Sequence, residues 1–204
     1  MITFTQTWWN KNVKSKINVF KSWIGNEDAE SKCYIARYLQ SKQYNTFIDV
    51  GCGTATMSKC LLNHKLSLEY TGVDSCDYLI NLGKENNITI INSDVRNMSN
   101  IINSKYDFGF SRHVLEHQES FSLALSELIR VSKYEACHIF FIKPEEVEII
   151  NYDPINNLYH NKYSIVDINT FLQNNTKVTS WEWVNINDNE IALHIILDFN
   201  KCIE

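Results

Sequence analysis

One stretch, Phe47 to Ala55 (FIDVGCGTA), constrains the fold of this chain more than any other. The bulky and β-branched residues before Gly51 are typical of a buried strand, and Gly51 and Gly53 permit the positive φ of a tight turn. A helix that begins at Thr54 points unpaired N–H groups and a positive dipole end over this turn. The stretch therefore predicts a strand, a glycine turn and a helix that together suit a ligand with a carboxylate or phosphate.

Two features separate this stretch from the dinucleotide-binding pattern GxGxxG. Thr56 stands where that pattern has its third glycine, and Asp49 stands two residues before the first. Asp-x-Gly-x-Gly resembles the first motif of class I S-adenosylmethionine-dependent methyltransferases, which implies that Asp49 faces the amino group of the cofactor's methionine portion. Ala55 replaces the family's third glycine with the smallest side chain, so we expect the loop to form. The cofactor-binding residues implied in the turn itself are Gly51, Cys52 and Gly53.

The next strand along the chain also ends in an acid. Tyr70 to Asp74 predicts a short strand, which a helix over Ser75 to Lys84 follows. Asp74 follows the first motif at close to the spacing, about 20 residues, at which an acid meets the ribose hydroxyls of a nucleotide-like ligand. A carboxylate there accepts hydrogen bonds from both hydroxyls, so Asp74 and Ser75 are predicted to bind the cofactor. The alternative interpretation is that Asp74 only caps the following helix.

Ile88 to Val95 predicts a third strand that closes on Asp94, so three consecutive strands end in Asp. Acids are poor core residues, whereas ligands of open α/β sheets bind outside the carboxyl ends of the strands. The resemblance implies that the side chain of Asp94 and the backbone amide of Val95 hold adenine.

A second motif follows the fourth predicted strand, Tyr106 to Phe110. The run YDFGFSRHVLEH resembles the fourth motif of the small-molecule branch of the same family, the methyltransferase type 11-like proteins, where a Leu-Glu-His triplet recurs. The resemblance implies that Ser111 and Arg112 contact the cofactor. His113 has two open interpretations, one functional and one structural. For His117 the favoured interpretation is a hydrogen bond that fixes the loop.

The remaining segments complete an alternation of strands and helices. Trp8 to Gln43 predicts two helices that either cover the pocket, with Trp23 to Asn26 nearest the cofactor, or simply pack. Residues 145–163 have turn chemistry and polar aromatic side chains, typical of a lid over a hydroxylated substrate or of a solvated connection. The other predicted elements are a helix over Ser120 to Ser132, a strand over Ala136 to Ile142, a helix over Ser164 to Leu172 capped by Ser164, and a hairpin of Val178 to Ile186 and Glu190 to Phe199.

Composition indicates one compact domain, because this 204-residue chain is 44% hydrophobic and contains only 6 Gly and 2 Pro. We divide it into a helical cap (1–43), a cofactor-binding core (45–143), a lid (145–163) and a terminal hairpin (176–200). The sequence shows no apolar run of about 18 residues and no signal peptide, so we expect a cytoplasmic protein without a membrane span. A net charge of −5 without a Lys/Arg cluster argues against nucleic acid as a partner.

The six cysteines stand at positions 33, 52, 60, 76, 137 and 202. They form no Cys-x-x-Cys pair, and no histidine lies at zinc-finger spacing from them. This pattern predicts reduced, mostly buried thiols, and neither a metal site nor a disulfide framework.

Five strand–helix alternations followed by a hairpin predict an α/β fold, a Rossmann-like doubly wound sheet of mostly parallel strands with helices on both faces. The resemblance adds a seven-stranded order with an antiparallel C-terminal hairpin, S-adenosylmethionine as the cofactor, and methyl transfer as the reaction. The chain lacks an Asn/Asp-Pro-Pro-aromatic motif after the fourth strand and lacks any Pro-Cys pair. An oxygen or aliphatic amine of a small molecule, such as a sugar, is left as the acceptor.

Two other classes of protein stay open. One is a catalytically inactive S-adenosylmethionine-binding module that acts as a regulatory or partner subunit. The other is a nicotinamide dehydrogenase, which Asp49 and the missing third glycine disfavour.

Deprotonating an attacking hydroxyl needs a group whose pKa lies near neutrality, and histidine supplies one. His64, His138 and His194 are predicted to lie away from the crevice. We rank His113 first as the general base because it directly follows the fourth strand, and His160 of the predicted lid second. The transfer requires no metal.

Overall fold

The computed structural model describes residues 12, 18, 26–155, 158–198 and 200. Most of the predicted first helix, and the stretch Trp23 to Gly25 that the sequence places near the cofactor, lie outside these residues. The predicted second helix is observed as α3 (Glu30–Leu39). Within the described part of the chain, no helix combines the length and the apolarity needed to cross a bilayer.

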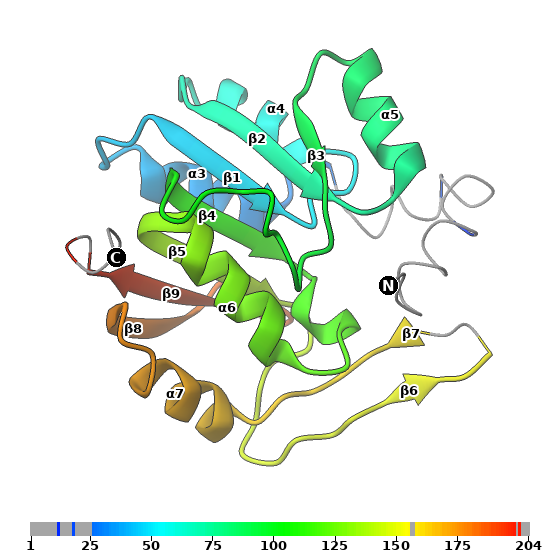
Figure 1. Cartoon of the computed structure of the whole chain (residues 1–204), viewed down its shortest axis with the longest axis vertical. Helices are drawn as coiled ribbons and strands as arrows, with labels where there is room; N and C mark the ends of the chain where they lie inside the picture. Colours follow the sequence, from blue (N-terminus) through cyan, green and yellow to red (C-terminus); the bar gives the residue numbers. More distant parts are fainter. Residues whose placement is uncertain (1–11, 13–17, 19–25, 156–157, 199, 201–204) are drawn as a thin grey trace.

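Seven strands form one sheet with the order β3-β2-β1-β4-β5-β9-β8 (Figure 1). The strands from β1 to β5 pair in parallel with their neighbours, and β9 is antiparallel to both β5 and β8. The doubly wound sheet and the terminal hairpin predicted from the sequence are confirmed. The strand bounds are β1 Thr46–Val50, β2 Glu69–Asp74, β3 Ile90–Asn92, β4 Tyr106–Arg112, β5 Ser132–Phe140, β8 Val178–Asn185 and β9 Ile191–Leu197.

Helices cover both faces of the sheet, because consecutive strand residues point to opposite sides. In β1, Phe47 packs with α3 and α4 whereas its neighbour Ile48 packs with α6 and α7, and both side chains are fully buried. Ser164 caps α7 as predicted, since its hydroxyl oxygen accepts from the backbone N–H of Asp167. The remaining helices are α4 Thr56–Asn63, α5 Asp77–Glu85, α6 Phe121–Val131 and α7 Ile165–Gln173.

The third strand is shorter than the sequence predicts. β3 covers Ile90–Asn92 and not Ile88 to Val95. The chain turns after β3 because both carboxylate oxygens of Asp94 accept hydrogen bonds from the backbone and guanidinium of Arg96. Asp94 therefore lies in a turn beyond the strand and not at the strand's own end.

Residues 145–155 and 158–163, here named the arm, contain two short strands paired as a β-hairpin, where the sequence predicts a lid or a solvated connection. Its short strands β6 (Tyr152–Asp153) and β7 (Leu158–Tyr159) pair antiparallel, and the arm extends away from the sheet (Figure 1). The buried side-chain amide of Asn161 donates to the carbonyl oxygen of Gln118 at 2.8 Å. This bond fixes the base of the arm to the segment that follows β4.

Candidate functional site

The carboxyl ends of the parallel strands meet at one edge of the sheet, where the chain changes direction between β1 and β4. From β1 the chain proceeds outward to β2 and β3, whereas β4 and β5 lie on the other side of β1. Ligands of open α/β sheets bind in the crevice at such a switch point. The ends of β1, β2 and β4 and the segments that follow them carry most of the predicted site residues, so the topology brings these residues together.

The glycine turn after β1 has the backbone of a ligand-binding loop. Gly51 and Gly53 adopt φ values of 77° and 56°, and Ala55 adopts the left-handed conformation at φ 55°. A Cβ atom at Gly51 would also overlap Cγ2 of Val114. Cys52 is buried and burial raises the pKa of its thiol well above the usual value, so the thiol is uncharged and a ligand over the turn would meet the backbone of Cys52. The turn forms with alanine in the family's third glycine position, at a strain of about 1 kcal/mol.

Asp74, at the end of β2, holds this turn in place. Its Oδ2 accepts from the backbone N–H of Gly53 at 3.0 Å, and its Oδ1 accepts from that of Cys76 at 2.9 Å. Burial raises the pKa of Asp74, although these two hydrogen bonds and a third from the backbone of Ser75 oppose the shift. A carboxylate has about four acceptor sites, so this one can take a further donor. The two interpretations drawn from the sequence, a contact at the start of the next helix and a ribose site shared with Ser75, are therefore compatible.

Asp49 lies within β1, and only 4% of it is exposed. The hydroxyl of Tyr70 donates to its Oδ2 at 2.7 Å. Burial raises the pKa of Asp49 to about 6, against the opposing effects of Tyr70 and of the Lys32 ammonium. A buried carboxylate of this kind suits a cationic amino group, which would favour its ionised form.

Lys32 on α3 is a site residue that the sequence did not reveal. It is 3% exposed, and burial lowers its pKa to about 8. Its Nζ donates to Oγ1 of Thr56 at 2.6 Å and to the carbonyl oxygen of Asn26 at 3.0 Å. Lys32 thereby joins α3 to the first residue of α4, next to the glycine turn.

We expect Asp49→Asn to raise the free energy of unfolding by up to about 3 kcal/mol at neutral pH. The variant removes a buried carboxylate whose pKa rises from 3.8 in the unfolded chain to about 6 in the folded one. A raised carboxyl pKa means that folding disfavours the ionised form of Asp49. The gain in unfolding free energy is therefore absent below the pKa of the unfolded chain, grows between the two pKa values, and is constant above the pKa of the folded protein. Urea unfolding at about pH 4 and about pH 7.5 measures it. An equal gain at both pH values would contradict the assignment, and the exposed Asp77→Asn is the control.

Four donors converge on Glu190, a second residue that the sequence did not reveal. Its Oε1 accepts from Oγ of Ser31 and from Nε2 of His113, each at 2.8 Å. The guanidinium of Arg112 donates to the same oxygen at 2.9 Å, and the side-chain amide of Asn187 donates to Oε2 at 3.1 Å. Burial alone would raise the pKa of Glu190, but these donors lower it to about 2. We call these five residues the Glu190 cluster, which joins α3, the end of β4 and the terminal hairpin.

Burial keeps His113 as a neutral imidazole, although the contact with Glu190 favours the charged ring. An ionised carboxylate only accepts hydrogen bonds, so the contact with Glu190 places the ring proton on Nε2 and the lone pair on Nδ1. Burial and the positive charge of Arg112 lower the pKa of His113, so the ring is neutral at pH 7. Its φ of 58° is uncommon for a residue other than glycine and is found often at functional sites. The side chain stays 20% exposed, which leaves the ring accessible.

A buried hydrogen-bond chain lies beneath this surface. Oγ of Ser111 lies 2.6 Å from Nδ1 of His138, and Nε2 of His138 lies 3.3 Å from the carboxylate of Glu116. The other Glu116 oxygen accepts from the backbone N–H groups of Phe141 and Ile142, which is why β5 ends before the predicted position. His138 and Glu116 are fully buried and no substrate reaches them, so the chain is structural. The Ser111 hydroxyl is committed to it, which leaves the Ser111 backbone for a cofactor contact.

The arm brings a second histidine to the end of β4. Nδ1–H of His117 donates to the carbonyl oxygen of Tyr159 at 2.8 Å, which is the loop-fixing bond predicted from the sequence. The exposed ring of His160 lies edge-on to that of His117, with ring centroids 5.1 Å apart. His117 and His113 both pack on Phe141. His113 and His160, the two predicted bases, are thus linked through one row of aromatic rings.

Asp94 and Val95 lie after β3 at the same edge of the sheet. Burial acts to raise the pKa of Asp94, but the hydrogen bonds from Arg96 lower it below its usual value. The side chain of Val95 packs against the main core. An adenine amino group would share the carboxylate with Arg96, and this contact stays a prediction.

Residues 48–140 match the family model described as "Methyltransferase domain". These residues form a methyltransferase domain. The match spans both sequence motifs and all the predicted cofactor-binding residues, from Asp49 to Arg112. S-adenosylmethionine is the cofactor of this methyltransferase.

Solved structures share the fold of this methyltransferase at low sequence identity. The Burkholderia thailandensis 1,6-didemethyltoxoflavin-N1-methyltransferase, solved with 1,6-didemethyltoxoflavin and S-adenosylhomocysteine, is 13% identical, with a TM-score of 0.65 over 93% of this chain and 86% of that chain. The plantazolicin methyltransferase BpumL, in complex with SAH, is 15% identical, with a TM-score of 0.65 over 96% of this chain and 94% of that chain.

A Rhodobacter sphaeroides structure titled "Putative Zn-dependent Alcohol Dehydrogenases" is 10% identical, with a TM-score of 0.69 over 97% of this chain and 99% of that chain. At such identities the likeness shows the fold alone, because one fold serves unrelated chemistries. A search of curated proteins found no match to this sequence. The activity is therefore assigned from the family model.

Proposed function

We propose that this methyltransferase acts on an oxygen or an aliphatic amine of a small hydroxylated molecule, such as a sugar. The observation that carries the proposal is the neutral imidazole of His113, which Glu190 orients at the end of β4. A hydroxyl or ammonium acceptor must lose a proton when it is methylated, and a positioned neutral histidine accepts one.

The residues around the glycine turn fit the cofactor. Asp49 would bind the amino group of the methionine portion, and Asp74 with Ser75 would accept from the ribose hydroxyls. The backbone from Gly51 to Gly53 permits close approach. When bound, S-adenosylmethionine supplies a methyl group that is intrinsically transferable because it is carried on a sulfonium. What remains for the chain is to align the acceptor and to remove its proton.

The proton is expected to move to Nδ1 of His113. The Nε2–H of the ring stays hydrogen-bonded to the Glu190 carboxylate, and that negative charge stabilises the imidazolium that forms. Arg112 and Ser31 hold Glu190 in place, so these residues position the base. Glu190 is a positioning residue in this scheme.

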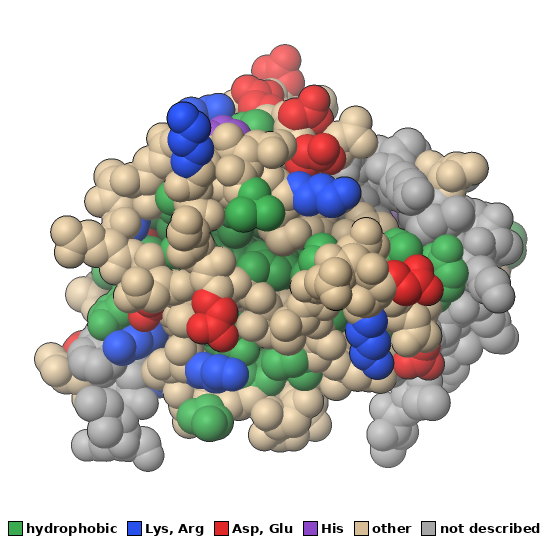
Figure 2. Space-filling view, turned by 90° about the horizontal axis from the view of Figure 1, so that it is seen from above, with side chains coloured by type: hydrophobic (Ala, Val, Ile, Leu, Met, Phe, Trp, Pro, Cys, Tyr) green, Lys and Arg blue, Asp and Glu red, His purple; other side chains and the backbone are tan. Residues whose placement is uncertain are grey.

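The position of the arm and the charge distribution on the surface both favour a small acceptor. The arm meets the end of β4 through His117 and carries the exposed apolar side chains of Val147, Ile149 and Ile155. On the face seen in Figure 2, the Lys and Arg side chains of the described residues stand apart among Asp and Glu and form no basic patch. Nucleic acid binding relies on such patches. In the B. thailandensis neighbour, a small molecule is bound together with S-adenosylhomocysteine.

The proposal is tested by incubating the protein with S-adenosylmethionine and a panel of sugars, alcohols, aliphatic amines, RNA and protein acceptors. Mass spectrometry then measures S-adenosylhomocysteine and the methylated product. We expect product from a free metabolite. Product from a macromolecule alone would contradict the small-molecule assignment. Tight cofactor binding without product from any acceptor would favour the second candidate, an inactive S-adenosylmethionine-binding subunit.

We expect Asp74→Ala to weaken S-adenosylhomocysteine binding at least about tenfold, because it removes two charge-assisted hydrogen bonds to the ribose, each of about 1.5–3 kcal/mol. Asp74→Asn keeps one acceptor oxygen and should lose less affinity. Isothermal titration calorimetry measures both variants, and thermal unfolding checks that the glycine turn survives the loss of the Gly53 contact. Asp77→Ala, an exposed acid in the first turn of α5, is the matched control and should bind normally. Unchanged affinity in Asp74→Ala would exclude the ribose placement.

A further inference from the structure

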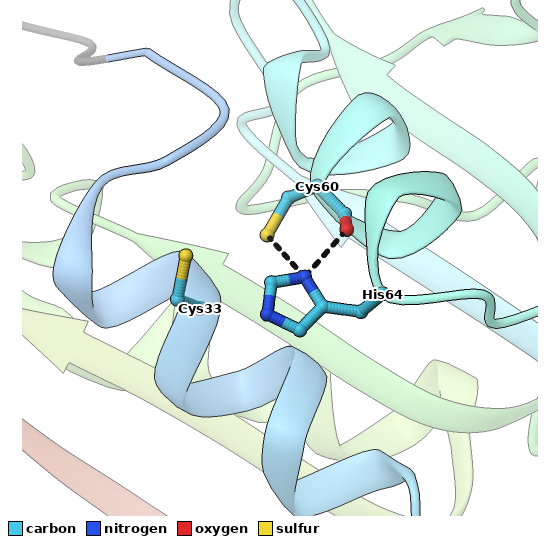
Figure 3. Close-up of side chains that lie close together, drawn as sticks. All are labelled: Cys33, Cys60 and His64. Carbon is cyan, nitrogen blue, oxygen red and sulfur yellow. Dashed lines mark hydrogen bonds between the residues drawn. The ribbon is translucent and has the colours of Figure 1, made fainter.

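The described cysteines are free thiols. Four of the five are buried, which confirms the burial that the sequence predicts. The fold nevertheless gathers two of them with a histidine. The Sγ atoms of Cys33 and Cys60 and a ring nitrogen of His64 all lie within 4.8 Å of one another (Figure 3). No spacing in the sequence marks this group, because Cys33 belongs to α3 whereas Cys60 and His64 belong to α4 and its C-terminal end.

The three side chains come together through helix geometry. Residues four positions apart share one face of a helix, so Cys60 and His64 both face the neighbouring α3. Figure 3 shows the two sulfurs and the imidazole ring turned toward one another between the two helices. Cys60 is fully buried, whereas Cys33 and His64 are partly exposed. The group therefore has a fixed inner ligand and two outer side chains that can adjust.

The His64 ring turns its Nδ1 toward Cys60. This nitrogen lies 3.0 Å from the carbonyl oxygen of Cys60 and 3.8 Å from its Sγ (Figure 3). A carbonyl oxygen only accepts, so without a cation the ring proton lies on Nδ1. A cation bound through Nδ1 would take the place of this hydrogen bond, with the ring proton on Nε2.

We propose that Cys33, Cys60 and His64 bind a soft divalent cation of the Zn²⁺ class, with water as the fourth ligand. Two sulfurs and an imidazole favour Zn²⁺ over Mg²⁺ or Ca²⁺, which take oxygen ligands. Zn–S and Zn–N bonds of about 2.3 and 2.0–2.1 Å place tetrahedral ligand atoms nearer to one another than 4.8 Å. Side-chain rotation of the partly exposed Cys33 and His64 supplies this closure.

The ion would fix the helix on which the active site depends. Consecutive α3 residues contact three separate parts of the molecule: Ser31 donates to Glu190, Lys32 donates to Thr56, and Cys33 lies in the metal group. A metal bond between α3 and α4 would therefore hold both the Glu190 cluster and the start of α4. The site is structural, and it stands independently of the acceptor proposed above.

The experiment is a Cd²⁺ titration of the reduced full-length protein, followed by the ultraviolet charge-transfer absorption of thiolate bound to Cd²⁺. We expect one strongly bound Cd²⁺ per chain and a higher melting temperature when the ion is bound. Co²⁺ in place of Cd²⁺ should give the visible spectrum of a tetrahedral site. A reduced protein that binds neither ion, or that carries a Cys33–Cys60 disulfide as isolated and binds no ion after reduction, would overturn the proposal.

Variants locate the ion. Cys33→Ser and Cys60→Ser should each lower Cd²⁺ affinity at least about 100-fold, beyond the 10–100-fold effect of an outer-shell change. His64→Gln should lower affinity while it keeps the thiolate absorption. Because Cys60 is fully buried, Cys33→Ser and His64→Gln carry the test if Cys60→Ser fails to fold. Cys76→Ser leaves the ligand set intact and should bind normally, and normal binding by Cys33→Ser would refute the site.

Discussion

Replacing His113 by alanine is expected to lower the rate of methyl transfer at least about a hundredfold, since removal of a general base costs about 10²–10⁴ in rate. The affinity for S-adenosylhomocysteine should stay within a few-fold, because His113 contacts Glu190 and Phe141 and none of the residues assigned to the cofactor's methionine or ribose portion. Steady-state kinetics with an identified acceptor measures the first quantity, and calorimetry measures the second.

The pH dependence of the rate supplies an independent check. The pKa of His113 is lowered from its usual value of 6.5 by burial, so the imidazole is neutral and competent at pH 7. The rate should reach a plateau there and fall only as the pH drops below the usual histidine pKa. His160→Ala is the control, and its effect should be much smaller. If His113→Ala keeps its rate, or loses cofactor binding as well, His113 is structural or binds the cofactor, and His160 becomes the candidate base.

Glu190→Gln is expected to lower the free energy of unfolding by about 3 kcal/mol at pH 7. The substitution leaves the guanidinium of Arg112, whose side chain is 12% exposed, without its anionic partner. Loss of one member of a buried ion pair typically costs about 3–5 kcal/mol. The fall in the pKa of Glu190 from 4.5 to about 2 gives a similar size. Urea unfolding measures the difference, and the exposed Glu182→Gln on β8 is the control, with a change below about 0.5 kcal/mol.

The contribution of Glu190 has a defined pH window. A depressed carboxyl pKa stabilises the folded state above the unfolded pKa of 4.5, and this stability is lost as the pH falls toward the folded pKa of about 2. The difference in unfolding free energy between wild type and Glu190→Gln should therefore shrink by roughly half between pH 7 and pH 3. A difference that is the same at both values would show that the charge on Glu190 is not what stabilises the fold. The same variant should slow methyl transfer, because the tautomer of His113 depends on Glu190.

Sequence alone determined the features that depend on neighbours in the chain. The strand, glycine turn and helix around Gly51 follow from conformational limits on single residues, and the cap at Ser164 follows from a hydroxyl near free N–H groups. Acids at the ends of consecutive strands predicted the edge of the sheet that carries the site, because parallel strands end on the same side. The family motifs added the cofactor.

The third strand was predicted too long because the prediction used only local residue preferences. Ile88 to Ile91 carries β-branched residues typical of a strand, and this preference extended the prediction to Val95. The bond between Asp94 and Arg96 turns the chain after β3 instead. Strand preference measures how well a residue fits a pleated surface. It contains no information about a side-chain contact, such as that of Asp94 with Arg96, that starts a turn.

Tertiary structure decided the contacts between residues far apart in the chain. Ser31 and Glu190 meet across 159 positions, and Arg112 and Glu190 across 78. The tautomer of His113, the buried ammonium of Lys32 and the grouping of Cys33 with Cys60 and His64 arise in the same way. Periodicity and motif spacing describe residues along one element, whereas these contacts depend on how α3, the end of β4 and the terminal hairpin pack. Their pKa values follow from burial and neighbouring charges, which exist only once the chain has folded.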